Sequence, residues 1–466
     1  MVSPMLKSLL LLLAAPCVLG ADVSLPAELF SPLVAQKILA TATQVQNPVK
    51  YPQWTDRDTG AWDYFNPDTW TSGFFPATLY ELNRRTTLCA AEVDAQSLNG
   101  SDWLLLGQTW SAGEVPSETN TGVGHDVGFL SFPFVNELQL HPDNQSAITA
   151  VNDFANHLAG RFNPIVGCTR SWDTTDPTDF QVIIDNMMNL EVLFVSANLT
   201  GNHTLIDIAT SHADHTAINH VRPDGSSFHV VDYNSTTGDV ISRHTSQGYA
   251  DNSTWSRGQA WGIYGFANMF HHTQNTSYLD VSRHMAQYFI EHIPDDGIVP
   301  WDFNAPLDPP RPADSSASMI AASGLILLSQ GELSLSPPNT TGSDYYINTA
   351  IQVIANNTAL AWRPSWQSLL ANGTVNNPQH NNLTGIVYGD YYFVKGANDL
   401  VQLGVATCNG TLTGALPSTP SNGSAPGPAA THTDAAQNNG AGAGGATVAT
   451  MLGAVSGAVL LGSFMI

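Results

Sequence analysis

Basic residues are scarce in this sequence of 466 residues, where 15 lysines and arginines stand against 39 aspartates and glutamates. The formal net charge of −24 argues against a nucleic-acid partner, because such a partner needs a basic surface that displaces counterions. Charged residues of both signs make up only 12%, while hydrophobic residues make up 43%. This composition excludes a globally disordered chain and allows one large domain with tails.

Cysteine is also scarce, and its positions give no metal-binding spacing. Cys17 lies in the N-terminal segment discussed next, which leaves Cys89, Cys168 and Cys408, an odd number. Three scattered cysteines form no zinc motif. For an oxidising compartment we expect either a Cys89–Cys408 bridge that joins the two ends of the domain, or three buried thiols.

Both ends of the chain are expected to lie outside the fold. Residues 1–20 combine Lys7, a leucine-rich run and small residues before Gly20, which predicts a secretory signal peptide, with a first core helix as the alternative. Residues 410–445 are rich in Ser, Thr, Pro, Gly and Ala, as flexible stalks are. Residues 446–466 form an uncharged apolar tail, which predicts a GPI-anchor signal that is removed, with a membrane helix as the alternative. We therefore expect a secreted protein held at the cell surface or cell wall, with no other membrane contact.

Thirteen Asn-X-Ser/Thr sequons occur along the chain. With a signal peptide present, we expect several of them to be glycosylated. One of them, Asn252, lies three residues before Trp255, so a glycan there would stand close to a residue of the candidate site.

Residues 27–405 form one continuous predicted domain in which helical periodicity dominates. In residues 144–162, for example, apolar side chains recur every three or four positions, which predicts a helix with one buried face. About twelve such helices predict an all-α fold of two concentric rings of six, with functional loops at one mouth. The exception is residues 227–242, which predict one small β-hairpin. The other predicted helices span residues 28–43, 72–84, 102–110, 126–139, 185–198, 203–218, 258–272, 278–293, 315–330, 343–356 and 386–402.

Asp185 is the most informative polar residue. It lies between two apolar runs, and a carboxyl group in such surroundings is desolvated, which raises its pKa and favours the acid form. A position at the start of a helix opposes the rise in pKa, because the helix dipole stabilises the anion by about 0.3–1 kcal/mol. A second carboxylate nearby raises the pKa again, and Asp126 is the candidate for it. Helix N-caps are the alternative for both aspartates.

The remaining polar candidates each have a second interpretation. The His125–Asp126 doublet also occurs in all-helical metal-dependent phosphohydrolases. In such an enzyme, histidines on other helices would supply the further metal ligands. The alternative for these histidines is that they lie on solvent-exposed helix faces. Arg257, between two tryptophans, is suited to hold a planar carboxylate by two bonds, or to pair with Asp251 in a structural role. His229 on the predicted hairpin is either a ligand contact or a structural histidine. The helical histidines are His212, His215, His271 and His272.

Ordered motifs around these residues carry a family resemblance. Over roughly residues 50–400 the chain resembles glycoside hydrolase family 88, the unsaturated glucuronyl hydrolases. The resemblance implies an (α/α)6 barrel, in agreement with the two predicted rings. The motifs are Trp-Thr-Ser-Gly-Phe-Phe at 70–75, His-Asp at 125–126, Ile-Asp-Asn-Met-Met-Asn-Leu at 184–190, Ser-Phe-His at 227–229, Gln-Gly-Tyr at 247–249, Trp-Ser-Arg-Gly-Gln-Ala-Trp-Gly at 255–262, Asp-Ser-Ser-Ala-Ser at 314–318 and Tyr-Gly-Asp-Tyr-Tyr at 388–392.

The resemblance implies a hydrolase that acts on oligosaccharides produced by polysaccharide lyases. These carry a 4,5-unsaturated uronic acid at the non-reducing end, and the family hydrates its vinyl ether. Protonation at C4 gives a cation stabilised by the ring oxygen, water adds at C5, and the hemiketal opens and releases the next sugar. The implied partner is this acidic oligosaccharide, and no cofactor or metal is expected.

The resemblance also assigns roles to residues. Asp185 is expected to protonate C4 and to activate water, and Asp126 to assist it. Arg257 is expected to offset locally the repulsion between an acidic protein and an anionic substrate. The chain departs from the family pattern at Ser246, where a histidine is expected, which puts one subsite contact in doubt. The residues expected to line the sugar slot or to contact the sugar and its carboxylate are Trp70, Trp172, Trp255, His125, His229, Gln247 and Arg257.

Two other functions remain open from the sequence. An unsaturated rhamnogalacturonyl hydrolase would use the same chemistry on pectin fragments. A non-catalytic sugar-binding protein of the cell wall would keep the aromatic residues without turnover, although the presence of both Asp126 and Asp185 favours catalysis.

Overall fold

The computed structural model describes residues 24–44, 50–90, 100–119 and 122–414. The predicted signal peptide and GPI tail, and nearly all of the predicted stalk, lie outside the described residues. The domain predicted over residues 27–405 falls within one unit, Met1–Gly423. Among the described residues, no helix is long and apolar enough to cross a membrane.

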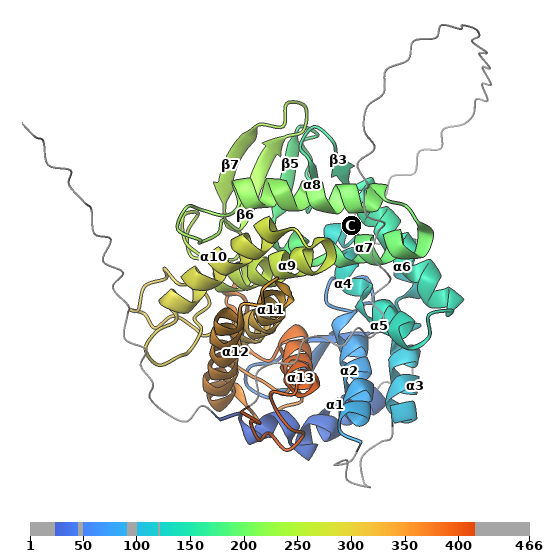
Figure 1. Cartoon of the computed structure of the whole chain (residues 1–466), viewed down its shortest axis with the longest axis vertical. Helices are drawn as coiled ribbons and strands as arrows, with labels where there is room; N and C mark the ends of the chain where they lie inside the picture. Colours follow the sequence, from blue (N-terminus) through green and yellow to red (C-terminus); the bar gives the residue numbers. More distant parts are fainter. Residues whose placement is uncertain (1–23, 45–49, 91–99, 120–121, 415–466) are drawn as a thin grey trace, which may run out of the picture. The chain divides into compact units, whose positions relative to one another are not determined.

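Alternating inner and outer helices build an (α/α)6 barrel, as predicted (Figure 1). Inner helices α5, α2, α13, α11 and α9 pack against one another in that order, and α7 is flanked by α6 and α8. Outer helices α3, α10 and α12 pack on α2, α9 and α11. The inner ring consists of α2 (Phe74–Leu88), α4 (Val127–Leu130) with α5 (Phe132–Leu140), α7 (Glu191–Thr200), α9 (Ser256–Thr273), α11 (Ser315–Ser334) and α13 (Val387–Gln402); the outer ring consists of α1 (Pro32–Gln44), α3 (Gly100–Ser111), α6 (Gln145–Gly160), α8 (Thr204–Asn219), α10 (Thr276–His292) and α12 (Thr340–Ala361).

Side-chain caps define where several of these helices begin. Asn144 accepts hydrogen bonds from the backbone N–H groups of Ser146 and Ala147 at the start of α6. Asn275 caps α10 and Asp314 caps α11 in the same manner. Each cap satisfies N–H groups that have no partner within the helix, and contributes about 1 kcal/mol.

The helix predicted over residues 185–198 begins later than the sequence pattern indicates. Ile184–Met188 forms a 3-10 turn, and α7 starts only at Glu191. This turn packs against α9 at Gly265, where an added Cβ would lie 2.5 Å from the Cβ of Met187. The close approach through a glycine therefore fixes the turn that carries Asp185.

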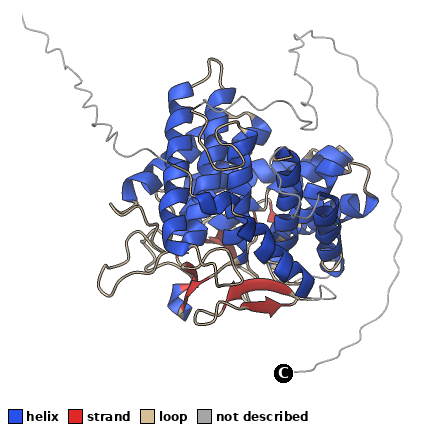
Figure 2. Cartoon of the chain, turned by 90° about the horizontal axis from the view of Figure 1, so that it is seen from below, coloured by secondary structure: helices blue, strands red, loops and turns tan. Residues whose placement is uncertain are grey.

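Strands are more numerous than the single predicted hairpin. The hairpin is confirmed as β6 (Val230–Asn234) and β7 (Val240–His244), but β5 (Asp179–Ile183) pairs antiparallel with β6 and makes a three-stranded sheet. Figure 2 shows the strands lying mostly at one end of the helices. The other strands form two-stranded sheets: β1 (Tyr51–Thr55) with β2 (Trp62–Phe65), β3 (Phe162–Asn163) with β4 (Cys168–Thr169), and β8 (Gly373–Asn376) with β9 (Asn381–Thr384).

The pairing of β5 with β6 brings two distant candidates together. Ile183 is opposite Val230 in the register, and the N–H of Ile184 donates to the carbonyl of His229 at 3.1 Å. Asp185 follows directly, so the edge of this sheet delivers both Asp185 and His229 to one place.

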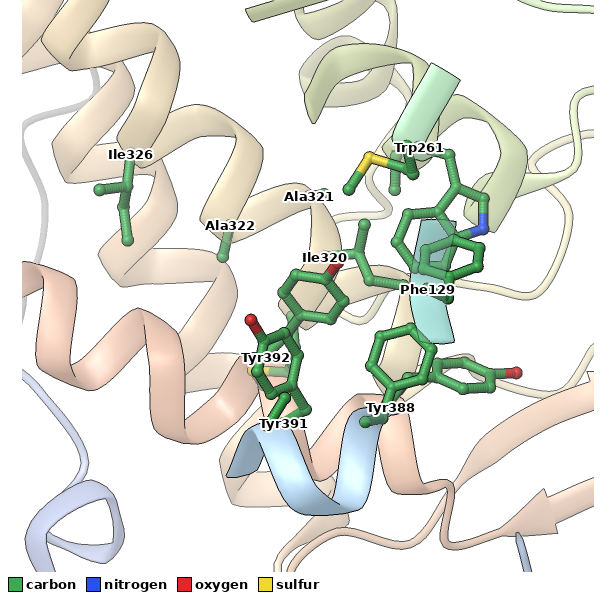
Figure 3. Close-up of a cluster of buried hydrophobic side chains, with 14 of the residues drawn as sticks. Phe129, Trp261, Ile320, Ala321, Ala322, Ile326, Tyr388, Tyr391 and Tyr392 are labelled. Carbon is green, nitrogen blue, oxygen red and sulfur yellow. The ribbon is translucent and has the colours of Figure 1, made fainter. Parts of the chain in front are cut away.

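Aromatic rings fill the barrel axis beneath this place. The ring of Trp261 lies 5.4 Å from that of Phe129 and 5.7 Å from that of Tyr392, centroid to centroid. Figure 3 shows these rings together with Tyr388 and Tyr391, which come from the first turns of α13. Such tilted and edge-to-face contacts add about 0.5–1.5 kcal/mol per pair to the burial of the rings, and they give the site a rigid floor.

A disulfide joins Cys89, which follows α2, to Cys408, which follows α13. Cys168 is a buried free thiol, so the alternative of three thiols is wrong. Because α2 and α13 are the first and last inner helices, the bridge closes the ring covalently across 319 residues of sequence.

We expect Cys89→Ser to lower the free energy of unfolding by about 2–5 kcal/mol, because the bridge restricts the unfolded chain. Thermal unfolding of the two proteins with and without reductant measures this. Reductant should lower the melting temperature of the wild type and of the matched control Cys168→Ala, but not that of Cys89→Ser. Equal melting temperatures for wild type and Cys89→Ser would show that the bridge contributes nothing.

Candidate active site

The N-terminal ends of the inner helices meet at the candidate site. Trp70 precedes α2, and its ring centroid lies 5.0 Å from that of Tyr388 in the first turn of α13. Tyr388 in turn lies 5.5 Å from the guanidinium carbon of Arg257 in the first turn of α9. Arg257 pairs with Asp314, the N-cap of α11. Since helix N-termini carry partial positive charge, this end of the barrel favours an anionic ligand despite the acidity of the whole chain.

Asp185 is a buried carboxylic acid at this meeting point. Its side chain is 11% exposed, and within the described part of the chain its Oδ2 has no hydrogen-bond partner. Burial and, to a lesser extent, the charge of Asp126 together raise the pKa of Asp185 to about 7, against the opposing effects of His125 and Arg257. The group therefore exchanges its proton near neutral pH, as a general acid or base requires.

Asp126 is close enough to Asp185 for its charge to raise the pKa of that group, and its side chain is 15% exposed. Its Oδ1 is 3.2 Å from Nε2 of His125, and Nδ1 of His125 lies 3.0 Å from the hydroxyl of Ser171. That hydroxyl oxygen accepts from the N–H of Ile183 and can donate to Nδ1. Nε2 of His125 is buried beside Asp126 without a hydrogen-bond partner among the described residues. Strand β5 and the segment before α4 thus hold the His125–Asp126 pair.

The N-cap alternative is wrong for Asp185, whereas Asp126 does occupy the N-cap position of α4 but without a side-chain cap. Neither Asp185, in the 3-10 turn, nor Asp126, before α4, makes a side-chain capping hydrogen bond. Neither carboxyl group is therefore engaged in capping a helix, and Oδ2 of Asp185 has no hydrogen-bond partner among the described residues.

His229 faces Asp185 between two tryptophans. Its ring centroid lies 4.4 Å from that of Trp255 and 6.0 Å from that of Trp172. Nδ1 accepts from the N–H of Ser246 at 3.2 Å, which leaves Nε2 as the donor, 3.9 Å from Oδ2 of Asp185. Burial, then the charge of Arg257, holds the pKa of His229 well below its usual value, so the ring is a neutral donor.

Arg257 joins its own segment at the start of α9 to three others. Its guanidinium donates to Asp314 at 2.7 Å, to Gln247 at 2.7 Å, to the carbonyl of Val375 at 2.7 Å and to the carbonyl of Thr374, and its carbon lies 4.6 Å from the Trp255 ring centroid. The partner expected from the sequence, Asp251, instead accepts from the N–H of Thr245. Because both terminal nitrogens are bonded to protein, Arg257 is arranged to position other residues of the site. The direct contact between Arg257 and a substrate carboxylate, expected from the sequence, stays a prediction.

Gln247 is oriented by that bond. Because its Oε1 accepts from Arg257, its amide N–H groups are left as the donors it can offer to a ligand. Its backbone carbonyl accepts from Nε1 of Trp301 at 2.7 Å, which fixes the loop before α9.

The structure brings the nine predicted site residues to one end of the barrel, and it adds two that sequence reasoning did not assign. Asp314 neutralises Arg257 in the interior, and burial raises the pKa of the Tyr388 phenol above its usual value. Both residues stand in motifs that carry the family resemblance, so these motifs could have indicated them from the sequence.

Among the described residues, the site atoms that are buried without a hydrogen-bond partner include Oδ2 of Asp185, Nε2 of His229, Nε1 of Trp255 and the hydroxyl of Tyr388. Unpartnered polar atoms in such number are typical of a ligand site.

The histidines considered for a metal do not assemble. His212 binds the N–H of Thr169 through Nδ1, and His272 pairs with Glu191 at 2.7 Å. Within residues 24–44, 50–90, 100–119 and 122–414, no group of three or more His, Cys, Asp or Glu is placed to hold a metal ion.

The sequence is similar to those of known unsaturated glucuronyl hydrolases. No protein-family profile matches the chain. The unsaturated glucuronyl hydrolase of Formosa agariphila is 37% identical over 335 residues, which span 70% of this chain and 78% of the relative. The unsaturated glucuronyl hydrolase of Bacillus sp. strain GL1 is 33% identical over 280 residues, 58% of this chain and 72% of the relative.

Solved structures agree with these relatives. A crystal structure of an unsaturated glucuronyl hydrolase specific for heparin superposes with a TM-score of 0.69 at 27% identity, covering 80% of this chain and 96% of that protein. The Bacillus sp. GL1 enzyme superposes with the same TM-score at 25% identity, covering 80% of this chain and 94% of that protein. The identity, the coverage and the barrel together show that this chain is a glycoside hydrolase of the unsaturated glucuronyl hydrolase family, family 88.

Proposed function

We propose that this enzyme releases a 4,5-unsaturated uronic acid from the non-reducing end of lyase-generated oligosaccharides, with Asp185 as the proton donor. The observation that carries the proposal is a carboxyl group that is buried, lacks a hydrogen bond to Oδ2 and has a pKa of about 7, beside a second carboxylate. An acid of this kind can protonate a weakly basic carbon only if it remains protonated near neutral pH, which its burial provides.

In the first step the Asp185 carboxyl group gives its proton to C4 of the C4=C5 double bond. The π electrons form the new C4–H bond, and the positive charge at C5 is shared with the ring oxygen. Asp185 becomes an anion next to this cation, and Asp126 supplies a second negative charge. Two carboxylates in a site from which water is largely excluded stabilise a cation far better than they would in bulk water.

In the second step a water molecule adds to C5. The Asp185 carboxylate takes a proton from this water as the C5–O bond forms, so Asp185 returns to its acid form and the charges balance. The product is a hemiketal at C5, which opens to a ketone and breaks the ring. Ring opening leaves the former ring oxygen as a hydroxyl group on C1, so C1 is a hemiacetal. This hemiacetal collapses to an aldehyde, and the neighbouring sugar leaves as an alcohol.

Substrate binding follows from the groups that face Asp185. The Trp172, Trp255 and Trp70 rings offer apolar surfaces on which a sugar ring can stack. The neutral His229 and the amide of Gln247 offer donors, and the helix N-termini favour the uronate charge. Arg257 acts on substrate mainly by fixing Gln247 and Trp255.

The relatives suggest which substrates to test first. Three relatives, from Streptococcus species, are named unsaturated chondroitin disaccharide hydrolases, and one solved homologous structure contains an unsaturated glucuronyl disaccharide of sulfated N-acetylgalactosamine. We therefore propose unsaturated glycosaminoglycan disaccharides as substrates of this enzyme. Unsaturated rhamnogalacturonyl fragments of pectin serve as the comparison in the same assay.

We also propose that the enzyme is a secreted glycoprotein held by a GPI anchor. The proposal is supported by the apolar residues after Lys7, by the thirteen sequons and by the uncharged tail over residues 446–466. Treatment of intact cells with a phosphatidylinositol-specific phospholipase should release the activity into the medium. Activity that stays with the membrane after complete cleavage of a known GPI protein would contradict the anchor.

Asp185→Asn tests the proton donor. Because the amide cannot give a proton to C4, we expect kcat to fall by about 10²–10⁴-fold with little change in KM, measured as the loss of ultraviolet absorbance of the unsaturated disaccharide. Asp173→Asn, at a side chain that is 70% exposed, is the matched control and should retain activity. Substantial activity in a folded Asp185→Asn enzyme would remove Asp185 from the mechanism.

The pH profile tests the coupling of the two aspartates. The first step needs protonated Asp185, so kcat/KM should decrease tenfold per pH unit above about pH 7. Asp126→Asn removes a charge that raises the pKa of Asp185, so the descending limb of its residual activity should move to lower pH. A limb that stays in place in Asp126→Asn, or that moves to higher pH, would show that Asp126 does not tune Asp185.

A further inference from the structure

A hollow of about 420 Å³ opens between the outer helices α10 and α12. Figure 1 shows α10, α11 and α12 as neighbours, and both outer helices contact α11. None of the residues that line the hollow belongs to the candidate active site. Its volume lies within the range of about 300–1,000 Å³ that is typical of small-molecule sites.

One wall of the hollow is a polar stripe on α10. Asp280, His284, Gln287 and Glu291 all line it and are all exposed. Their spacing of four, three and four residues places them on one face of the helix, over about 16 Å of its length. The wall is therefore long enough for an extended ligand and offers acceptors and donors along its whole length.

The other wall is aromatic. Tyr345 and Tyr346 of α12 line the hollow with ring centroids 5.3 Å apart, and Tyr345 is 51% exposed. An exposed tyrosine presents an apolar ring face next to a hydroxyl group. A pyranose ring has the same combination, an apolar C–H face edged by hydroxyl groups, so the two surfaces match.

The charges of the hollow select against anions. Arg283 is the cation of the lining, and it donates to Glu332 through Nε and one terminal nitrogen, at 2.7 and 2.6 Å, and to Asp280 through the other at 2.7 Å. Glu291, the other carboxylate of the lining, accepts a hydrogen bond from Gln287 at 2.9 Å and has no cationic partner among the described residues of the lining. With Arg283 already paired, the remaining charge is negative, so this hollow is unsuited to a uronate and suited to a neutral sugar.

We propose that this hollow, the α10–α12 groove, is a second carbohydrate site that binds a neutral oligosaccharide. The groove would hold the enzyme on uncharged glycan while the barrel end acts on charged chain ends. This binding is independent of the proposed catalytic function, because it uses other residues on the outer ring.

Titration of the glycosylated enzyme with cellopentaose and with chitopentaose, followed by saturation-transfer NMR, tests the proposal. We expect at least one of these neutral probes to bind the wild type, and Tyr345→Ala and Gln287→Ala to weaken that binding at least tenfold. Tyr345→Phe keeps the ring and should bind within about twofold of the wild type. Leu105→Ala, at another exposed position on the outer ring, is the matched control.

The same variants separate this site from catalysis. kcat/KM of Tyr345→Ala on an unsaturated disaccharide should equal that of the wild type. Failure of both neutral probes to bind, binding unaffected by Tyr345→Ala, or binding of a lysine-rich peptide instead of the sugars would overturn the neutral-sugar site. An inactive wild type that still binds the probes through Tyr345 would refute only the catalytic proposal.

Discussion

The desolvation of one carboxyl group next to another is the constraint on which the rest of this structure depends. A buried aspartate near a second carboxylate is expensive to ionise, so Asp185 holds its proton to about pH 7 instead of about 4. The barrel supplies what this requires: an apolar turn fixed against α9 through Gly265, an aromatic floor, and a strand that delivers His229. The same burial that destabilises the anion makes the group a proton donor at neutral pH.

Arg257 explains how so polar a site stays ordered. A lone buried guanidinium would be strongly destabilising, but here it is paired with Asp314 and bonded to two carbonyls and an amide. These partners come from three different segments of the chain, since both carbonyls belong to β8. The cation therefore joins the loop before α9, the start of α11 and strand β8 around the sugar-binding tryptophans. Arg257 contributes to the site mainly by holding these segments in place, and less by attracting the charge of the substrate.

Much of this was predictable from the sequence, for reasons that differ between residues. Helices such as α6 show a regular apolar face, so two rings of helices follow from periodicity, and the apolar neighbours of Asp185 already indicate a raised pKa. The short strands β5 and β8 have too few residues for a recognisable alternation, so the third strand was missed. The partner of Arg257 was also missed, because Asp314 lies 57 residues away and only the packing of α9 against α11 joins them. Likewise, the α10–α12 groove arises from two helices that are separate in sequence.

The most direct measurement is the titration of the Asp185 carboxyl group itself, by carbon-13 NMR of enzyme labelled at aspartate carboxyl carbons, with Asp185→Asn to assign the signal. We expect a midpoint near pH 7 in the wild type and a lower midpoint in Asp126→Asn. A midpoint near pH 4 in both proteins would mean that Asp185 is an ordinary carboxylate and not the proton donor.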